Sequence, residues 1–417
     1  MRYDFDEIID RRGTGDVKHC LLEEYFGRPD LLPLWVADMD FATPPFILDA
    51  MRRRLEHPIL GYTVLPEGYW ETVAGWVESH YGWHVETEWM RYIPGIVKGI
   101  GLVVNVFTKP SAETEISRAM PRQGRGRMGS NVFTKPSDSV IIQPPVYHPF
   151  RITPEGNGRR IVWNPLLPAE GETAYAMDFE GLERVCDDRC RLLILSNPQN
   201  PTGICWDRVS LERLARFCHE RGIVVVSDEI HCDMALFGHR HIPFASVSPE
   251  AAACSITFQA PSKTFNMAGM VSSYCIIPNP ELRQRFFGWL DANEFDAPHL
   301  LAPIATMAAY REGEEWRRQL VAYIEENVRY VETFCRERLP MLRPLRPQAS
   351  FLVWLDCRAL GLSQERLVSL FVNQARLALN DGSMFGPGGE GFMRMNVGCP
   401  RSVLREAMER MQCIVNS

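Results

Sequence analysis

Lys263 is the first residue of this sequence whose type and position suggest chemistry. It lies in the run Ala260-Pro261-Ser262-Lys263-Thr264-Phe265, directly after the apolar run 255–258. A lysine bounded by small and hydroxyl residues at a strand end can enter a ligand-binding crevice, where its amine can bond to a carbonyl compound or move a proton. A lone lysine in a loop is more often a solvated charge, so this interpretation needs support from elsewhere in the chain.

A carboxylate follows a second apolar run, Val224–Val226, in the order Ser227-Asp228-Glu229-Ile230-His231. An acid at the carboxyl end of a buried parallel strand points into the crevice where such sheets bind ligands. There it can pair with a positively charged ring nitrogen of a ligand and keep that nitrogen protonated. We assign this role to Asp228, whereas Glu229 should face the other way. A metal site formed by Asp228, His231 and Asp233 is disfavoured, because no residues that would orient such ligands are evident.

Two glycine-bearing turns could bind other parts of the same ligand. Residues 196–203 contain Asn200, whose amide would donate a hydrogen bond to a phenolic oxygen. Residues 94–100 open a helix that we expect to run to about Phe107, and backbone N–H groups at a helix start hold a phosphate well. Taken alone, each segment is equally an ordinary turn or helix start. The phosphate would be bound by the backbone of Ile96, Val97 and Lys98.

The elements that must position these residues alternate along the middle of the chain. Short β-rich runs stand between helical patterns, which is typical of a mostly parallel sheet covered by helices. Between two of the runs, residues 207–221 carry apolar side chains at the spacing of one helix face. The β-rich runs are Val140–Ile142, Leu192–Leu195, Ile223–Val226 and Tyr274–Ile277.

After Pro278 the pattern changes to long helices, which indicates a second lobe of the α/β protein. The expected elements are helices over roughly 280–312, 314–338 and 402–413 and a strand over 351–355. The expected division is an N-terminal segment of residues 1–45 that joins the smaller domain, a large domain of residues 46–285, and a small α/β C-terminal domain of residues 286–417.

A seven-residue string occurs twice, as Asn105–Ser111 and as Asn131–Ser137, an offset of 26 residues (131 minus 105). We interpret residues 109–134 as an inserted surface loop, because this stretch is rich in Arg and Gly and lacks the apolar residues of a core. Its arginines could bind a polyanion, but a solvated loop is the preferred interpretation. Residues 124–129 match a dinucleotide-binding fingerprint only as a string, since no strand precedes them and no apolar helix follows.

The composition favours small-molecule chemistry. The 417 residues are 46% hydrophobic and 23% charged with a net charge of −7, the profile of a globular protein without general attraction to nucleic acid or anionic lipid. No apolar run is long enough to span a membrane, and the first residues are too acidic for a signal peptide. The 12 cysteines are scattered, so we expect reduced thiols and a cytoplasmic protein.

Together these segments resemble the fold-type I enzymes that use pyridoxal 5'-phosphate (PLP), the aspartate-aminotransferase-like superfamily, and most closely its cystathionine β-lyase branch of MalY/PatB type. The resemblance spans nearly the whole chain. It implies a PLP-dependent transferase-like fold with a mostly parallel seven-stranded sheet, and a homodimer with active sites at the subunit interface. The supporting strings are Leu34-Trp35-Val36-Ala37-Asp38-Met39-Asp40-Phe41, Gly61-Tyr62-Thr63, Pro145-Val146-Tyr147-His148-Pro149-Phe150, Ser227-Asp228-Glu229-Ile230-His231-Cys232-Asp233, Ala260-Pro261-Ser262-Lys263-Thr264-Phe265-Asn266 and Arg394-Met395-Asn396.

The resemblance also implies which residues surround the cofactor. Lys263 would be the Schiff-base lysine and, once freed by substrate, the base that removes the α-proton. Asp228 would pair with the ring nitrogen. Asn200 and His231 would lie near the phenolic oxygen, and Tyr147 would stack on the ring. The phosphate would be held by Ser262 and the backbone of Ile96, Val97 and Lys98.

Substrate binding is implied in the same way. Arg394 would grip the substrate carboxylate in a two-pronged pair, which a lysine could not reproduce, with Ala37 beside it. Tyr62 would reach in from the partner subunit as a catalytic and substrate-binding residue. Many relatives have Tyr at the position of His231, whereas the lyase branch has His there, so this residue favours the lyase interpretation. The insert is a departure from these relatives, and we expect the second copy of the repeat to supply the native turn into Val140.

The expected reaction is therefore carbon–sulfur β-elimination on cystathionine or a related cysteine S-conjugate, which yields a thiol, pyruvate and ammonia. The alternative is amino-group transfer by a class I/II aminotransferase, because the shared residues serve both outcomes. A regulatory protein that keeps the fold without turnover is a third possibility. Transcription factors with this fold carry an N-terminal DNA-binding domain, for which the sequence has no room before Leu34.

Overall fold

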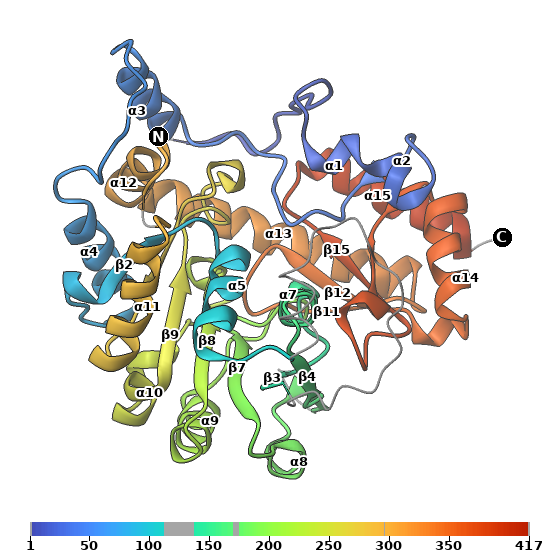
Figure 1. Ribbon diagram of the computed structural model, residues 1–417. Coiled ribbons are helices and arrows are strands. Elements are labelled where there is room, and N and C mark those ends of the chain that lie inside the picture. The colour runs from blue at the N-terminus through green and yellow to red at the C-terminus, as the bar shows by residue number, and fades with distance from the viewer. Residues whose placement is uncertain (1, 112–136, 170–174, 296, 416–417) are drawn as a thin grey trace, which may run out of the picture.

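The computed structural model describes residues 2–111, 137–169, 175–295 and 297–415 of the chain (Figure 1). Its centre is a seven-stranded sheet in which five neighbouring strands are parallel. Only β10 runs antiparallel to both of its neighbours, β2 and β9. The strand order is β2 (Met90–Ile93), β10 (Ser273–Ile276), β9 (Ser255–Gln259), β8 (Val224–Asp228), β7 (Cys190–Ser196), β3 (Ser139–Ile142) and β4 (Arg160–Trp163). The expected mostly parallel sheet is confirmed.

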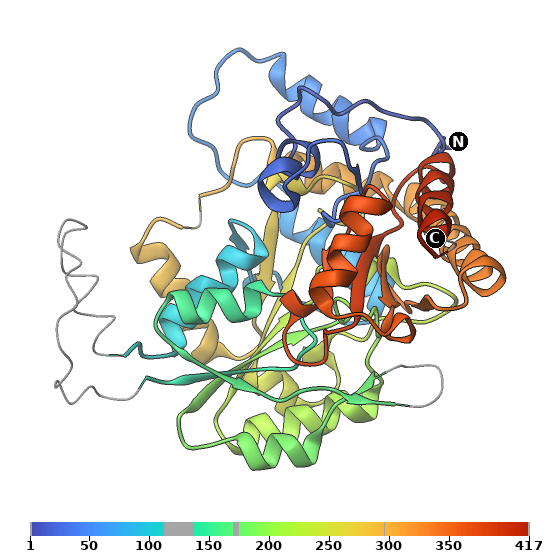
Figure 2. The same ribbon diagram turned by 90° about the vertical axis from the view of Figure 1, so that its right-hand side faces the viewer.

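Helices cover both faces of this sheet, which explains its almost uninterrupted apolar strands. Within β7, Leu192 and Ile194 pack into the core on one face, whereas Leu193 and Leu195 pack into the core on the other. The first face is covered by α5 (Ile96–Phe107), α7 (Pro149–Gly156) and α11 (Pro280–Ala292). The second face is covered by α8 (Phe179–Val185), α9 (Arg208–Glu220) and α10 (Pro249–Cys254). Of these, α8 and α9 are the green helices at the bottom of Figure 2. The predicted helix over 207–221 is α9, which begins after its cap Asp207.

A smaller antiparallel sheet follows in the C-terminal part of the chain. Its order is β11 (Arg343–Leu345), β12 (Leu352–Asp356), β15 (Phe392–Asn396) and β14 (Asn380–Asp381). Around it lie α13 (Glu314–Arg338), α14 (Gln364–Ser369) and α15 (Arg401–Val415). The N-terminal segment, with α1 (Val17–Cys20) and α2 (Leu22–Phe26), reaches the same region, because β1 (Leu32–Pro33) pairs with β13 (Leu377–Ala378).

The prediction of one helix over 280–312 is wrong. The structure has α11 to Ala292, then a connection whose described residues are not helical, and then α12 (Ala302–Glu312). Pro298 and Pro303 explain the break, because proline lacks the N–H that an interior helical position needs and is tolerated in the first turn, where Pro303 lies. Helix α12 packs against α3 (Pro45–Leu55) and α4 (Tyr69–Tyr81).

The inserted stretch and the arginine-rich fingerprint string lie almost wholly outside the described residues, but the two ends that enclose them are described. The backbone N–H of Asp138 donates to the Lys109 carbonyl at 3.0 Å, and the Lys109 N–H donates to the Asp138 carboxylate at 2.7 Å. Helix α5 and strand β3 on either side are regular. None of the helices among the described residues is both long and apolar enough to cross a membrane.

Candidate active site

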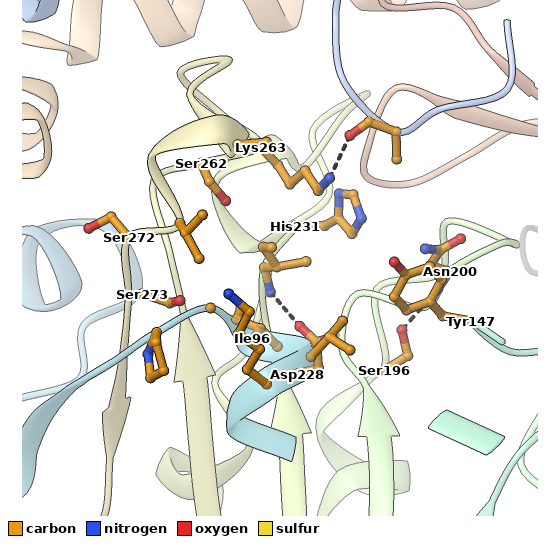
Figure 3. A pocket seen from close by; sticks show the side chains of 18 residues that line it. Ile96, Tyr147, Ser196, Asn200, Asp228, His231, Ser262, Lys263, Ser272 and Ser273 are labelled. Carbon is orange, nitrogen blue, oxygen red and sulfur yellow. Dashed lines mark hydrogen bonds between the residues drawn. The ribbon is translucent and has the colours of Figure 1, made fainter. Parts of the chain in front are cut away.

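A cavity of about 240 Å³ lies where β7, β8 and β9 end and α5 begins (Figure 3). The parallel register, with Ser196 opposite Asp228, brings the residues that follow these strands to one edge of the sheet. The cavity is lined by ten of the residues singled out in the sequence: Ala37, Ile96, Val97, Lys98, Tyr147, Asn200, Asp228, His231, Ser262 and Lys263. Segments far apart in the chain therefore meet in one place.

Lys263 enters the cavity from the loop that follows β9. Its amine donates a hydrogen bond of 2.5 Å to the backbone carbonyl of Ala37, drawn as a dashed line in Figure 3. Removal from water lowers the pKa of Lys263 to about 8, although the carboxylates of Asp38 and Asp228 oppose this shift. An amine with this pKa is partly neutral near pH 7.5, as a nucleophile or a base must be.

Asp228 is the last residue of β8, and its carboxylate accepts a hydrogen bond of 3.1 Å from the Ile230 N–H. Burial raises the pKa of this carboxyl to about 7, although the Ile230 N–H and the positive charge of Lys263 oppose this shift. Glu229 faces away from the cavity, as predicted, and is fully buried among hydrogen-bond donors that include His241 and the Phe244 N–H. Asp228 is therefore poised to pair with a positive charge on a ligand, whereas Glu229 stabilises the fold.

His231 and Tyr147 lie on the same side of the cavity as Asn200 (Figure 3). The Nδ1 atom of His231 is buried without a hydrogen-bond partner in the structure. Burial, with the charges of Lys263 and Arg394, lowers the pKa of His231 to about 3, so the ring is neutral. The backbone N–H of Tyr147 donates to the Asn200 carbonyl at 3.0 Å, which ties the two segments together.

The other end of the cavity is formed by the first turn of α5 and by hydroxyl groups. Gly95 precedes the helix with a φ of 99°, and among the described residues no side-chain cap is seen at this helix start. Ser262 lines this part of the cavity together with Ser272 and Ser273, which were not predicted from the sequence. Free helix N–H groups and hydroxyls are suited to an anion such as a phosphate. Ser272 and Ser273 gave no signal because they lie at the start of the antiparallel strand β10, Ser272 just before it and Ser273 as its first residue, and this strand reaches the site through sheet pairing.

Arg394 lies beside the cavity in the middle of β15 and is buried. Its guanidinium donates to the Asn200 side chain at 3.0 Å, the Asn380 side chain at 2.5 Å and the Trp35 carbonyl at 3.1 Å. Its Nε atom has no hydrogen-bond partner in the structure. Asn380 was missed, because a two-residue strand has no recognisable sequence pattern. A buried guanidinium with donor capacity to spare is a site for a carboxylate.

Tyr62 is the one predicted site residue that this chain does not bring near the others. Its side chain is fully exposed. The segment around it, residues 57–66, is largely exposed and has no helix or strand.

The fold and the cavity together define a class of protein, the PLP-dependent enzymes of the aminotransferase fold. The family model for aminotransferase class I and II matches residues 127–411. The chain belongs to this family.

Among its relatives is cystathionine beta-lyase PatB of Bacillus subtilis (strain 168), which is 41% identical over 413 residues, 99% of this chain and 100% of that protein. A solved structure of cystalysin from Treponema denticola, containing pyridoxal 5'-phosphate, has a TM-score of 0.89 and 32% identity, with 100% of this chain and 99% of that chain covered. The PLP-bound C–S lyase from Staphylococcus hominis has a TM-score of 0.86 and 30% identity, with the same coverage.

Proposed function

We propose that this protein is a PLP-dependent carbon–sulfur β-lyase that cleaves cystathionine or a related cysteine S-conjugate to a thiol, pyruvate and ammonia. The observation that carries the proposal is the single cavity that Lys263 and Asp228 line, with Arg394 beside it. It occurs in a chain that matches a cystathionine β-lyase over its whole length.

The residues present fit PLP. A volume of about 240 Å³ suits a small flat molecule better than a dinucleotide. Lys263 would hold the aldehyde and Asp228 the ring nitrogen, whose positive charge would restore the low pKa of that carboxyl. The donors at the start of α5 and the nearby serines would hold the phosphate, and the unpartnered His231 and Asn200 would lie near the phenolic oxygen. When bound, PLP supplies a ring that stabilises negative charge at the α-carbon of an amino acid.

The protein's own residues would bind the substrate, remove its α-proton and hold the cofactor ring. Arg394 would bind the substrate carboxylate with its free donor capacity, with Ala37 lining the same space. The amine of Lys263 would take the α-proton, since its pKa of about 8 leaves a neutral fraction at physiological pH. Tyr147, whose ring lines the cavity, would stack on the cofactor.

We further infer a homodimer in which Tyr62 of each subunit serves the other's site. The support is an exposed apolar segment around Tyr62, with Ile59 65%, Leu60 64% and Val64 82% exposed. A patch of this kind marks an interaction surface. Mixing the inactive variants Tyr62→Ala and Lys263→Ala should restore activity in hybrid dimers that contain one intact site, whereas no restoration would rule out the shared site.

The reaction is tested by incubating the holoenzyme with cystathionine and measuring pyruvate and thiol without an added keto acid. Equal amounts of both products are expected. Borohydride treatment should abolish the visible absorbance band and leave a mass adduct on Lys263, and Lys263→Ala should show neither. An amino group that moves to a keto acid while no pyruvate forms would instead favour the second candidate, an aminotransferase, to which the family's name points.

The expected cytoplasmic location stays a prediction supported by composition alone. It would be tested by fractionating cells that express the protein and assaying the lyase activity of each fraction.

A further inference from the structure

Part of the N-terminal segment lies against the cavity, which Ala37 lines. We call residues 35–38 the strap. Each of its backbone carbonyls accepts a hydrogen bond from a side chain of another segment. Arg394 donates to the Trp35 carbonyl at 3.1 Å, and Lys263 donates to the Ala37 carbonyl at 2.5 Å. The side-chain amide of Asn396 holds the carbonyls on either side of Ala37, at 2.7 Å and 2.6 Å. The position of the strap thus sets the position of the lysine amine and of the guanidinium.

Charged residues fix the strap at its C-terminal end. Arg11 binds both carboxylate oxygens of Asp38, at 2.8 Å and 3.1 Å, and also reaches Asp40 at 2.9 Å. Lys18, whose side chain is fully buried, binds both oxygens of Asp40 at 2.8 Å, lies 3.5 Å from the Asp38 carboxylate, and donates to the Asp38 carbonyl at 3.2 Å. The two cations therefore lie among three carboxylates, since Arg11 is also 3.5 Å from Asp16, and these anions offset the burial of Lys18.

We propose that Asp38 is a positioning residue for Lys263: its carboxylate, clamped by Arg11 and Lys18, fixes the Ala37 carbonyl against the amine and supplies a negative charge to it. This inference deepens the proposed function, because it rests on Lys263 as the reactive lysine. Asp38 differs in this from Asp40: both bind the same cations, but Asp38 adjoins Ala37, whose carbonyl accepts from the amine, whereas Asp40 is three residues from Ala37.

The electrostatics of the site agree with this assignment. The negative charge of Asp38 raises the pKa of Lys263 against the effect of burial, and the positive charge of Lys263 in turn lowers the pKa of Asp38. The other charged or titratable groups that interact with Lys263 among the described residues are Asp228, Arg394 and His231. Asp38 also lines a second cavity, beside Arg11 and Asn266, so an asparagine there has space and solvent.

The test is the pH dependence of acetylation of Lys263 by trace acetic anhydride in the cofactor-free enzyme, followed by mass spectrometry. Asp38→Asn should lower the pKa of the Lys263 amine by about one unit, the effect of losing a neighbouring opposite charge. Arg11→Gln should raise it, because Asp38 then keeps its charge without its main counter-ion. Asp40→Asn is the matched control and should leave the amine's pKa close to that of the wild type.

Shifts of opposite sign in the pKa of Lys263, down in Asp38→Asn and up in Arg11→Gln, distinguish this role from a loosened fold. Entry of solvent into a loosened site would raise the pKa of Lys263 in both variants. If Asp38→Asn does not fold, as judged by thermal unfolding, the double variant Arg11→Gln/Asp38→Asn takes its place, and its Lys263 amine should have a lower pKa than in Arg11→Gln alone. Equal shifts in Asp38→Asn and Asp40→Asn, or no shift in Arg11→Gln, would overturn the proposal. Borohydride trapping of PLP on Lys263 is measured separately in the wild type. Absence of trapping would contradict the proposed function, whereas the pKa shifts in the variants test only the role of Asp38.

Discussion

Deletion of residues 112–137 is expected to leave the fold intact and to raise the free energy of unfolding. The repeat makes this cut exact: after the deletion, Asn105–Ser111 continues directly into Asp138, and removal of residues 105–130 would give the same protein. In the structure, the Asp138 N–H already donates to the Lys109 carbonyl. After the deletion these become the first and fourth residues of a Lys109-Pro110-Ser111-Asp138 turn, with proline at its favoured second position.

The magnitude follows from chain entropy. The connection between Lys109 and Asp138 shortens from 29 residue steps (138 minus 109) to 3. The cost of closing a loop grows with the logarithm of its length, so the deletion should stabilise the protein by up to about 2 kcal/mol. This is the whole effect if residues 112–136 make no stabilising contacts.

Urea unfolding followed by circular dichroism measures this change, and the absorbance band with added PLP reports the integrity of the site. A second variant, in which residues 112–136 are replaced by a Gly/Ser sequence of equal length, is the control. It should match the wild type, because it changes the sequence and keeps the loop length.

A decrease of more than about 1 kcal/mol in the free energy of unfolding of both variants would contradict this prediction, because the segment would then make contacts that a flexible chain cannot replace. Loss of PLP binding in the deletion alone would show that the second copy of the repeat does not supply the turn before β3 (Ser139–Ile142).

Four substitutions test the site. Asp228→Asn should lower kcat for pyruvate formation by at least about 100-fold while the absorbance band persists, because the ring nitrogen loses its counter-ion but the lysine remains. Arg394→Lys should lower kcat/KM by about 10- to 150-fold, the loss expected for a charged two-pronged hydrogen bond. Gly95→Ala should destabilise the protein by about 1–3 kcal/mol in urea unfolding, because its φ is 99° and a Cβ would lie 3.0 Å from Val271. In the cofactor-free protein, Lys263→Met should raise the free energy of unfolding by up to about 3 kcal/mol below pH 8, and this gain should shrink between pH 8 and 10.5. The reason is that the lowered pKa of Lys263 destabilises the folded state only at a pH at which the lysine of the unfolded chain is protonated.

Features that depend on local sequence were predictable. The apolar runs before Asp228 and Lys263 are long enough to be recognised as buried strands, and a parallel strand necessarily delivers its end to the same edge of the sheet as its neighbours. The helix after Gly95 could be predicted from its apolar periodicity. The places of the site residues at the ends of these strands and at the start of this helix could therefore be predicted as well. The proline-interrupted connection between Ala292 and Ala302 was missed because the helical pattern on both sides concealed it.

The amino-acid sequence by itself determined which side chains could carry the chemistry, because their identities and their places at strand ends are local properties. Only the tertiary structure decided that the Trp35 carbonyl would meet Arg394, 359 positions along the chain, and that the Ala37 carbonyl would receive the amine of Lys263. Every residue has a backbone carbonyl, so the sequence gives no sign of which carbonyl will be used. That choice depends on how the N-terminal strap packs against β15 and is held there by Lys18 and Arg11.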